Sequence, residues 1–337
     1  MSSKVITVIG SLNTDLVSVT ARVPSGGETL TGTSFHTGPG GKGANQAVAA
    51  ARLCRANPKV SSGLASKSQD EDIVVKMVGA VGDDEFGPKI IEGMREDGID
   101  VDGIEVVKNQ PTGVAVIIVE STTGENRILL NPGANSTLAP QSFTNLTSLS
   151  QAGLLILQLE IPIPTILQII TTASQTTPPT PILLNPAPAV PLPDSIYPSI
   201  THLILNESEA ALLTGRPAES VEAEGFDWSV VTAEFIAKGV NNIVVTLGAK
   251  GAFWASLGSG NRSTKSGSVP AVKVEKVVDT TAAGDTFVGA YAVAVVRARD
   301  RGEGVDLEEV VKWACRASAR TVQKEGAQAS IPWADEV

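Results

Sequence analysis

The sequence predicts an α/β protein with a doubly wound, mostly parallel central sheet flanked by helices, together with a small β-sheet lid. Strand-like and helix-like runs alternate along most of the 337 residues, which is typical of this fold class. The strand-like runs are nearly continuous in valine, isoleucine and leucine, as in a parallel sheet that is buried on both faces. Hydrophobic residues make up 42% of the chain, which is enough to bury a large core.

The predicted elements follow one another in regular order. The predicted strands cover residues 4–10, 74–82, 153–160, 181–185, 202–205 and 241–247. The predicted helices cover residues 45–53, 86–97, 164–174, 207–213, 231–238, 284–301 and 307–324. We expect one more strand at residues 272–278. Because ligands of such sheets bind beyond the carboxyl ends of the strands, the loops that follow the strands should carry the site.

Two segments interrupt the alternation. Residues 12–38 and 101–131 contain β-rich pieces with no helix between them. We interpret these segments as a small separate sheet that forms a lid within a single domain of residues 1–337; the alternative is that they are edge strands of the main sheet. Residues 57–72 form a polar insertion to which the sequence assigns no role.

Composition argues against several classes of partner. A net charge of −10 disfavours binding to nucleic acid or to an anionic membrane. No apolar run reaches the roughly 18 residues of a membrane-spanning helix, and the N-terminus leads directly into a strand without the apolar region of a signal peptide. The two cysteines, Cys54 and Cys315, give no disulfide framework. We therefore expect a cytoplasmic protein, with the nucleus left open.

Residues 279–290, with the sequence DTTAAGDTFVGA, are the most informative stretch. Ala282, Ala283 and Gly284 form a turn of small residues before a predicted helix, whose first N–H groups lack intrahelical partners and can bind an anion. Asp285 lies in the first helical turn. It could take the proton of an attacking hydroxyl group while the N–H groups hold a transferred phosphate. The alternative is that Asp285 only caps the helix.

Residues 38–45, with the sequence GPGGKGAN, form a glycine-rich turn. The stretch contains G-x-G-x-x-G, but it lacks a clear preceding strand and an acidic residue about 20 positions later, so a dinucleotide site is not predicted. Lys42 is followed by Gly43 rather than by serine or threonine, which argues against a P-loop. Such a turn can bring Lys42 and Asn45 against a small polyhydroxy ligand; the alternative is a loop with a solvated lysine.

Polar residues also follow the predicted strands. Asn13 and Asp15 follow the first strand and could hold sugar hydroxyl groups, although an Asx turn would also use them. Glu160 ends another strand, where it could equally cap a helix that begins near Pro162.

Two further loops suit a phosphorylated ligand. Asn206 and Glu209 follow a strand, and Glu209 could hold Mg²⁺ through water, but the same pair has the spacing of a helix capping box. Residues 246–251 open space for a flat or phosphorylated ligand. They also read as a hairpin turn into residues 252–255, and both roles can hold at once.

Together these motifs resemble the ribokinase-like (PfkB) carbohydrate kinases. The matching motifs occur in order over almost the whole chain: GSLNTD (10–15), GGKGANQA (40–47), GDD (82–84), TGVA (112–115), NPAPA (185–189), NESE (206–209), TLG (246–248), AAGDTF (282–287) and GAQ (326–328). The resemblance implies ATP-dependent phosphorylation of D-ribose at its 5-hydroxyl group. The alternatives are another sugar or nucleoside kinase of the family, or a sugar-binding protein without turnover.

The resemblance also implies roles for individual residues. Asp285 would be the general base, with an anion hole at Ala282, Ala283 and Gly284. Ribose would be held by Asn13, Thr14, Asp15, Gly41, Lys42, Gly43, Asn45, Glu160 and Asp285. ATP would contact Asn206, Thr246, Leu247, Gly248, Ala249, Lys250, Gly251, Gly284 and Asp285. Mg²⁺ would lie near Glu209, and a K⁺ ion would lie among Asp279, Thr281, Thr321, Lys324, Gly326 and Ser330. The lid would pair with a second copy to form a homodimer.

Overall fold

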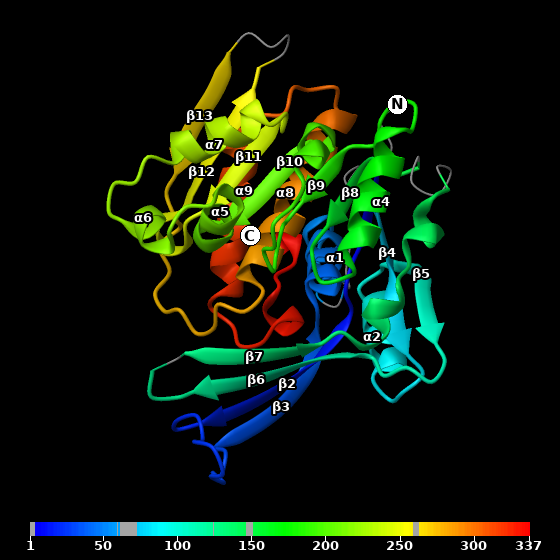
Figure 1. Cartoon of the computed structure of the whole chain (residues 1–337), viewed down its shortest axis with the longest axis vertical. Helices are drawn as coiled ribbons and strands as arrows, with labels where there is room; N and C mark the ends of the chain where they lie inside the picture. Colours follow the sequence, from blue (N-terminus) through cyan, green and yellow to red (C-terminus); the bar gives the residue numbers. More distant parts are fainter. Residues whose placement is uncertain (1–3, 59, 61–72, 124, 146–150, 259–262) are drawn as a thin grey trace.

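A nine-stranded sheet forms the centre of the computed structural model, which describes residues 4–58, 60, 73–123, 125–145, 151–258 and 263–337. The strand order is β13-β12-β11-β10-β9-β8-β1-β4-β5 (Figure 1). The β11–β12 and β12–β13 pairs are antiparallel, and the other pairs are parallel. The strands are β1 (Val5–Ile9), β4 (Val74–Gly82), β5 (Asp100–Val107), β8 (Leu154–Leu157), β9 (Ile182–Leu184), β10 (His202–Asn206), β11 (Asn242–Thr246), β12 (Ala252–Leu257) and β13 (Thr264–Val269).

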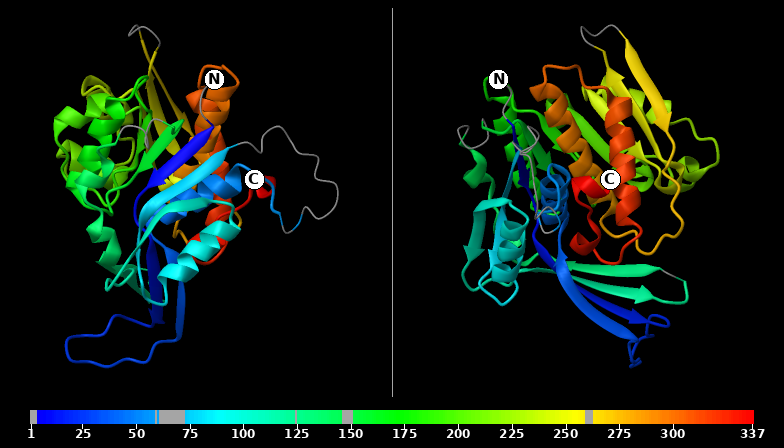
Figure 2. Two further views of the ribbon diagram at one scale, coloured as in Figure 1. Left: turned by 90° about the vertical axis from the view of Figure 1, so that its right-hand side faces the viewer. Right: turned by 180° about the vertical axis from the view of Figure 1, so that it is seen from behind.

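Helices cover both faces of this sheet. Figure 1 shows α4 (Ile163–Ser174), α5 (Glu207–Thr214), α6 (Ala218–Glu222) and α7 (Trp228–Ala237) in front of the sheet. The view from behind in Figure 2 shows the opposite face, which is covered by α1 (Lys42–Leu53), α2 (Gly87–Glu96), α8 (Ala283–Asp300) and α9 (Leu307–Thr321).

Side chains of successive strand residues lie on opposite faces of the sheet and pack into two separate cores. Leu154 and Ile156 of β8 pack in the core under α1 and α8, whereas Leu155 and Leu157 pack in the core under α4 and α7. All four side chains are fully buried. This is why the strands contain apolar residues without polar alternation, as the sequence indicates.

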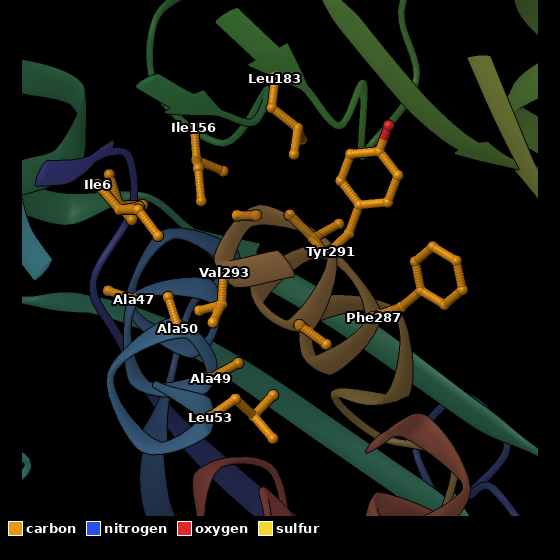
Figure 3. Close-up of a cluster of buried hydrophobic side chains, with 14 of the residues drawn as sticks. Ile6, Ala47, Ala49, Ala50, Leu53, Ile156, Leu183, Phe287, Tyr291 and Val293 are labelled. Atoms are coloured by element: carbon orange, nitrogen blue, oxygen red, sulfur yellow. The ribbon is translucent and has the colours of Figure 1, made fainter. Parts of the chain in front are cut away.

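The packing of α1 against α8 is unusually close. Figure 3 shows Ala47, Ala49 and Ala50 of α1 facing the side of α8 that carries Val293. A Cβ atom at Gly289 of α8 would lie 2.4 Å from the Cβ of Ala49, so only glycine fits there. This contact lies about two turns from the start of both helices and draws their N-termini together.

A second sheet of four strands extends from the end of the first (Figure 1). Its order is β3-β2-β6-β7, with β2 (Asn13–Thr20), β3 (Ser34–Gly40), β6 (Gly113–Glu120) and β7 (Asn126–Asn131). Asn135, in the 3₁₀ turn η1 (Gly133–Thr137), fixes its base: Oδ1 accepts from Leu12 N at 2.9 Å, and Nδ2 donates to Asn13 Oδ1 at 2.8 Å. The other 3₁₀ turns are η2 (Pro140–Phe143), η3 (Asp194–Ser199), η4 (Gly248–Lys250), η5 (Gln328–Ser330) and η6 (Ala334–Glu336).

The doubly wound sheet and the second small sheet are confirmed, but two boundaries predicted from the sequence are wrong. Residues 100–107 belong to the large sheet, where β5 pairs with β4, so only β6 and β7 of the segment 101–131 lie in the small sheet. Residues 272–278 form no strand. The N–H of Val278 donates to the carbonyl of Val322 at the end of α9, which attaches this segment to a helix instead of a sheet edge.

Most of the polar insertion, residues 59 and 61–72, lies outside the described residues. No helix in the described part of the chain has the length and apolarity needed to cross a membrane.

Candidate active site

The polar residues singled out from the sequence converge at one edge of the large sheet. The carboxyl ends of β1, β8, β9, β10 and β11 meet there, next to the N-termini of α1, α5 and α8. In parallel sheets this edge is the usual place of a ligand.

Asp285 lies in the first turn of α8 and is only 7% exposed. It does not cap the helix: the cap position is Ala282, and no side chain bonds there. Instead, Asp285 Oδ1 accepts from Gln46 Nε2 at 2.9 Å, and Oδ2 accepts from Asn45 Nδ2 at 3.0 Å. Both donors belong to the first turn of α1, so the α1–α8 contact places the carboxylate. The helix-capping alternative for Asp285 is therefore wrong.

The turn before α8 presents backbone N–H groups to an open space. Ala282 has φ 58° and ψ 7°, a left-handed conformation that costs a non-glycine residue about 1 kcal/mol. Within the described part of the chain, the N–H groups of Ala282, Gly284 and Asp285 have no hydrogen-bond partner. Ala283 differs from the prediction because its N–H donates to Thr280 O at 3.2 Å and stabilises the turn. Gly284 is exposed, and a Cβ built on it would touch nothing within 4 Å.

Glycines in the 38–45 segment bring its backbone against the end of β1. Gly41 has φ 89°, and a Cβ there would lie 2.8 Å from Asn13 N. A Cβ on Gly43 would lie 2.6 Å from Ser11 N. In this structure, therefore, both glycines serve close packing of two loops.

Glu160 connects the same two loops. Its Oε2 accepts from Ser11 Oγ at 2.6 Å and from the backbone N–H of Lys42 at 2.9 Å. Lys42 is the first residue of α1, so the carboxylate lies at the positive N-terminal end of that helix. The helix that Glu160 serves is thus α1, and not the one that follows it in the chain.

Four charged side chains, Asp15, Lys42, Glu160 and Asp285, interact at this edge of the sheet. Burial raises the pKa of Asp15 to about 7, and the negative charges of Glu160 and Asp285 add to the rise while Lys42 opposes it. Burial alone would lower the pKa of Lys42, but the charges of Asp285 and Glu160 outweigh it and the pKa is raised. Lys42 is therefore the cation that allows three carboxylates to lie together. The Asp15 carboxyl group lies so close to Gly40 that a Cβ there would be 2.3 Å from it.

Asn13 and Thr14 are also at this edge and are 2% and 5% exposed. Asn13 Oδ1 accepts from Asn135 and keeps a second lone pair, so the Asn13 amide can both donate to a ligand and accept one hydrogen bond from it.

On the other side of Asp285, the Asn206–Glu209 pair forms the predicted capping box of α5. Asn206 Oδ1 accepts from Glu209 N, and Glu209 Oε2 accepts from Asn206 N, both at 2.8 Å. Burial raises the pKa of Glu209, and the charge of Lys42 opposes the rise while that of Asp285 adds to it. Glu209 thus caps α5 and also interacts electrostatically with Lys42 and Asp285.

Residues 246–251 form the predicted hairpin turn between β11 and β12. Gly248 and Gly251 have positive φ values of 54° and 102°. Gly248, Ala249 and Lys250 are exposed, while Leu247 is buried. Lys250 Nζ pairs with Glu207 Oε1 at 3.0 Å.

The residues predicted to surround a monovalent cation divide into two groups. Asp279 bridges two loops, because its Oδ1 accepts from the N–H and hydroxyl of Thr281 and its Oδ2 accepts from Gly326 N at 2.9 Å. The side chains of the remaining three are bonded elsewhere: Thr321 to Thr286, Ser330 to Ala327, and Lys324 to Glu336. Thr321 and Ser330 are the donors in these bonds, so their hydroxyl oxygens keep lone pairs, whereas Lys324 could offer an ion only its backbone oxygen.

Several buried polar residues behind the site were not identified from the sequence. Gln46 and Gln158 are fully buried, and with Asn185 they form a connected set of side-chain amides behind Asp285. The signal was present: Gln158 interrupts an otherwise apolar strand, and a polar residue in a fully buried strand needs a specific partner.

Among the described residues, no group of three histidine, cysteine, aspartate or glutamate side chains is arranged to hold a metal ion. A divalent ion at this site would depend on a carboxylate such as Glu209 together with oxygens of its ligand.

Comparison with known proteins assigns this geometry to a family. The family model described as pfkB family carbohydrate kinase matches residues 3–334. The chain is 41% identical to a ribokinase of Schizosaccharomyces pombe, covering 97% of this chain and 94% of the relative. It is 35% identical to a ribokinase of Bacillus subtilis, covering 98% and 97%. The structure of Arabidopsis thaliana ribokinase complexed with ribose and ATP superposes with a TM-score of 0.80 at 32% identity, covering 99% and 97%.

Proposed function

Because this chain belongs to the pfkB family of carbohydrate kinases, we propose that it transfers the γ-phosphoryl group of ATP to the 5-hydroxyl of D-ribose. The observation that carries the proposal is the position of Asp285: a buried carboxylate one residue from free backbone N–H groups, facing Asp15, Lys42 and Glu160. One group can accept a proton and the other can hold an anion, within one helical turn. Phosphoryl transfer from a nucleotide to a hydroxyl group needs both.

In the proposed mechanism, ribose lies over the loops that Glu160 ties together, with its hydroxyl groups donating to Asp15 and Glu160. Asp285 accepts the proton of the 5-hydroxyl as the oxygen attacks the γ-phosphorus. The N–H groups of Ala282 and Gly284, at the positive end of α8, stabilise the negative charge on the transferring group. Lys42 balances the surrounding carboxylates. The nucleotide lies along Asn206 and the exposed turn 246–251.

Two ions are part of the proposal. Mg²⁺ would be held by Glu209 through water and by phosphate oxygens, and it would neutralise phosphate charge; the raised pKa of Glu209, which reflects burial near Asp285, supports a need for a cation there. K⁺ would lie between the loops that Asp279 bridges. Asp279 has lone pairs beyond its three hydrogen bonds. Burial acts to raise its pKa, but these hydrogen bonds outweigh burial and the pKa is lowered, so Asp279 is anionic and fits a cation.

A kinase for a different sugar or for a nucleoside is the nearest alternative, and a binding protein without turnover is the more distant one. The three carboxylates and Lys42 favour a small, fully hydroxylated ligand, because a nucleoside base would leave buried charges unpaired. Retention of Asp285 with open N–H groups supports turnover.

The test is ADP formation measured over D-ribose, 2-deoxyribose, fructose and adenosine, each with and without K⁺. We expect D-ribose to give the highest kcat/KM, and its product to carry the phosphate at the 5-position by ³¹P NMR. A higher kcat/KM for fructose or adenosine would overturn the substrate assignment, and absence of turnover with all four would overturn the kinase assignment.

The small sheet is proposed as a lid over the sugar and as a dimer surface. Its strands begin at Asn13 and Gly113, directly beside the site, and its outer strand β7 is exposed throughout. Phe35, Ile128 and Leu129 are 56–66% exposed, which is apolar area that a second copy could cover. Light scattering of the purified chain should give twice the monomer mass, and Leu129→Asp should reduce it to the monomer mass.

A further inference from the structure

The amide network behind Asp285 reaches from a backbone carbonyl in the sheet to the carboxylate. Asn185 Nδ2 donates to Ile204 O at 2.9 Å, and Asn185 Oδ1 accepts from Gln46 Nε2 at 3.0 Å. Gln46 Nε2 also donates to Asp285 Oδ1 at 2.9 Å. Gln158 Nε2 donates to Gln46 Oε1 at 2.6 Å. The chain of contacts therefore links β8, β9 and β10 to the first turn of α8 through a single side chain of α1.

The orientation of each amide in this network is determined by its neighbours. A backbone carbonyl can only accept, so the NH₂ group of Asn185 must face Ile204 and its oxygen must face Gln46. The Gln46 NH₂ group must then face Asn185, and its second hydrogen is directed at Asp285. A rotated Gln46 amide would direct its oxygen at two acceptors. The sheet thus sets the direction of the hydrogen bond that reaches Asp285.

The two amides that contact Asp285 differ in their surroundings. Gln46 is fully buried, and both hydrogens and the oxygen of its amide are bonded. Asn45 is 5% exposed, and its Oδ1 has no partner in the described part of the chain. Gln46 therefore has one fixed arrangement, whereas Asn45 has an unused acceptor that a ligand hydroxyl can fill.

We propose that Gln46 is a positioning residue for phosphoryl transfer: it holds Oδ1 of Asp285 and leaves Oδ2, on the Asn45 side, as the oxygen that accepts the substrate proton. This inference rests on the proposed role of Asp285 as the base. Loss of the Gln46 amide lets the carboxylate rotate away from the reacting hydroxyl. Displacement of a catalytic group by about 1 Å can lower turnover by about 10²-fold.

The test compares Gln46→Met with a matched control, Gln158→Met. Both changes remove one fully buried amide of the same network, but Gln158 does not contact Asp285 and the Gln46 NH₂ group remains anchored by Asn185 when Gln158 is lost. For Gln46→Met we expect kcat to fall by about 10- to 100-fold, with the KM values of ribose and ATP nearly unchanged. For Gln158→Met we expect lower thermal stability with kcat within about threefold of the parent. Equal kcat losses in both variants, or a normal kcat in Gln46→Met, would overturn the proposal.

A second variant keeps the test informative if Gln46→Met does not fold. In Gln46→Glu, the new carboxyl group can hold Asp285 only while protonated, because two carboxylates at this distance repel. Its kcat relative to the parent should therefore rise as pH falls from about 8 to about 6, a change that a purely structural role would not produce. A pH-independent ratio would contradict the proposal.

The activity of the parent chain distinguishes failure of the proposed function from failure of the role proposed for Gln46. If the parent chain does not phosphorylate ribose, the proposed function fails whatever the variants do. If the parent is active and Gln46→Met keeps its kcat, only the positioning role of Gln46 fails.

Discussion

The half of the site proposed to bind the sugar is built from buried and half-buried side chains, whereas the half proposed to bind the nucleotide is built from exposed turns. Asn13, Thr14 and Asn45 are at most 5% exposed. By contrast, Asn206 and residues 248–250 are exposed. Buried polar groups discriminate strongly because a wrong ligand leaves them unpaired, while open backbone accepts a ligand with little discrimination. Substitutions should therefore cost more in the sugar half than in the nucleotide half.

The largest expected effect is that of Asp285→Asn, which lies where the two halves meet. The change keeps the shape and two hydrogen-bonding atoms but removes the proton acceptor, so kcat should fall by about 10²–10⁴-fold. Ribose binding, measured by calorimetry on the folded variant, should persist. A kcat near that of the parent would mean that another group is the base.

Asp15→Ala should have the next largest effect, and only on the sugar. Loss of a charged hydrogen-bond partner in a closed site costs about 1.5–3 kcal/mol, which corresponds to a rise of about 10- to 150-fold in the KM of ribose. The KM of ATP should change much less. Equal rises in both KM values would place Asp15 outside the sugar half.

K⁺ should act on the turn that joins the two halves. Asp279 bridges this turn to Gly326, so an ion bound there would hold the N–H groups of Ala282 and Gly284 in place. In a sodium-free buffer we expect K⁺ to raise kcat on the order of tenfold in the parent chain and to have no effect in Asp279→Asn. Full activity without K⁺, Cs⁺ or NH₄⁺ would contradict the proposed cation site but not the kinase assignment.

The pH dependence of sugar binding should reflect Asp15. Its pKa is raised to about 7, so the carboxyl group is largely protonated below that pH and ionised above it. Because the ionised form accepts hydrogen bonds from sugar hydroxyl groups, the KM of ribose should fall as pH rises through about 7 and then level off. In the matched variant Asp15→Asn this step should disappear. A step of the same size in both would assign the titration to another group.

The free energy of unfolding should change with pH in the opposite direction to ribose binding. A carboxyl group whose pKa is higher in the folded chain binds more protons folded than unfolded, so the ligand-free protein should lose stability as pH rises from about 4 to about 7. Thermal unfolding of the parent and of Asp15→Asn across this range measures the difference.

The smallest effect is expected in the nucleotide half. Lys250 is exposed and, among the described residues, pairs only with Glu207, and exposed ion pairs contribute about 0–1 kcal/mol. Lys250→Ala should therefore change the KM of ATP by less than about fivefold. A rise in the KM of ATP as large as the rise expected in the KM of ribose for Asp15→Ala would show that the exposed half also discriminates strongly between ligands.

The sequence predicted one half of the site better than the other for a physical reason. The turns at Asn206 and 246–251 are local in sequence, so capping and hairpin signals identified them correctly. The sugar half depends on contacts between distant segments: Gln46 meets Asp285 and Gln158 only because Gly289 lets α1 approach α8. The periodicity of a sequence does not predict contacts between such distant segments.

The prediction of a strand at residues 272–278 was wrong for a similar reason. The valines of this segment suit a strand, yet Val272, Val277 and Val278 are 43–54% exposed. The segment instead forms hydrogen bonds to Val322 at the end of α9. These bonds place Asp279 where its carboxylate accepts from the N–H of Gly326. The tertiary position of that helix end, and not the local composition, decides its conformation.

The comparison implies that the sugar half binds ribose through its own side chains, without help from the nucleotide half, and calorimetric titration of D-ribose into the nucleotide-free chain tests this central claim most directly. We predict saturable binding of one ribose per chain without nucleotide, and a large loss of that binding in Asp15→Ala. Ribose binding that occurs only after a non-hydrolysable ATP analogue is added would contradict the account.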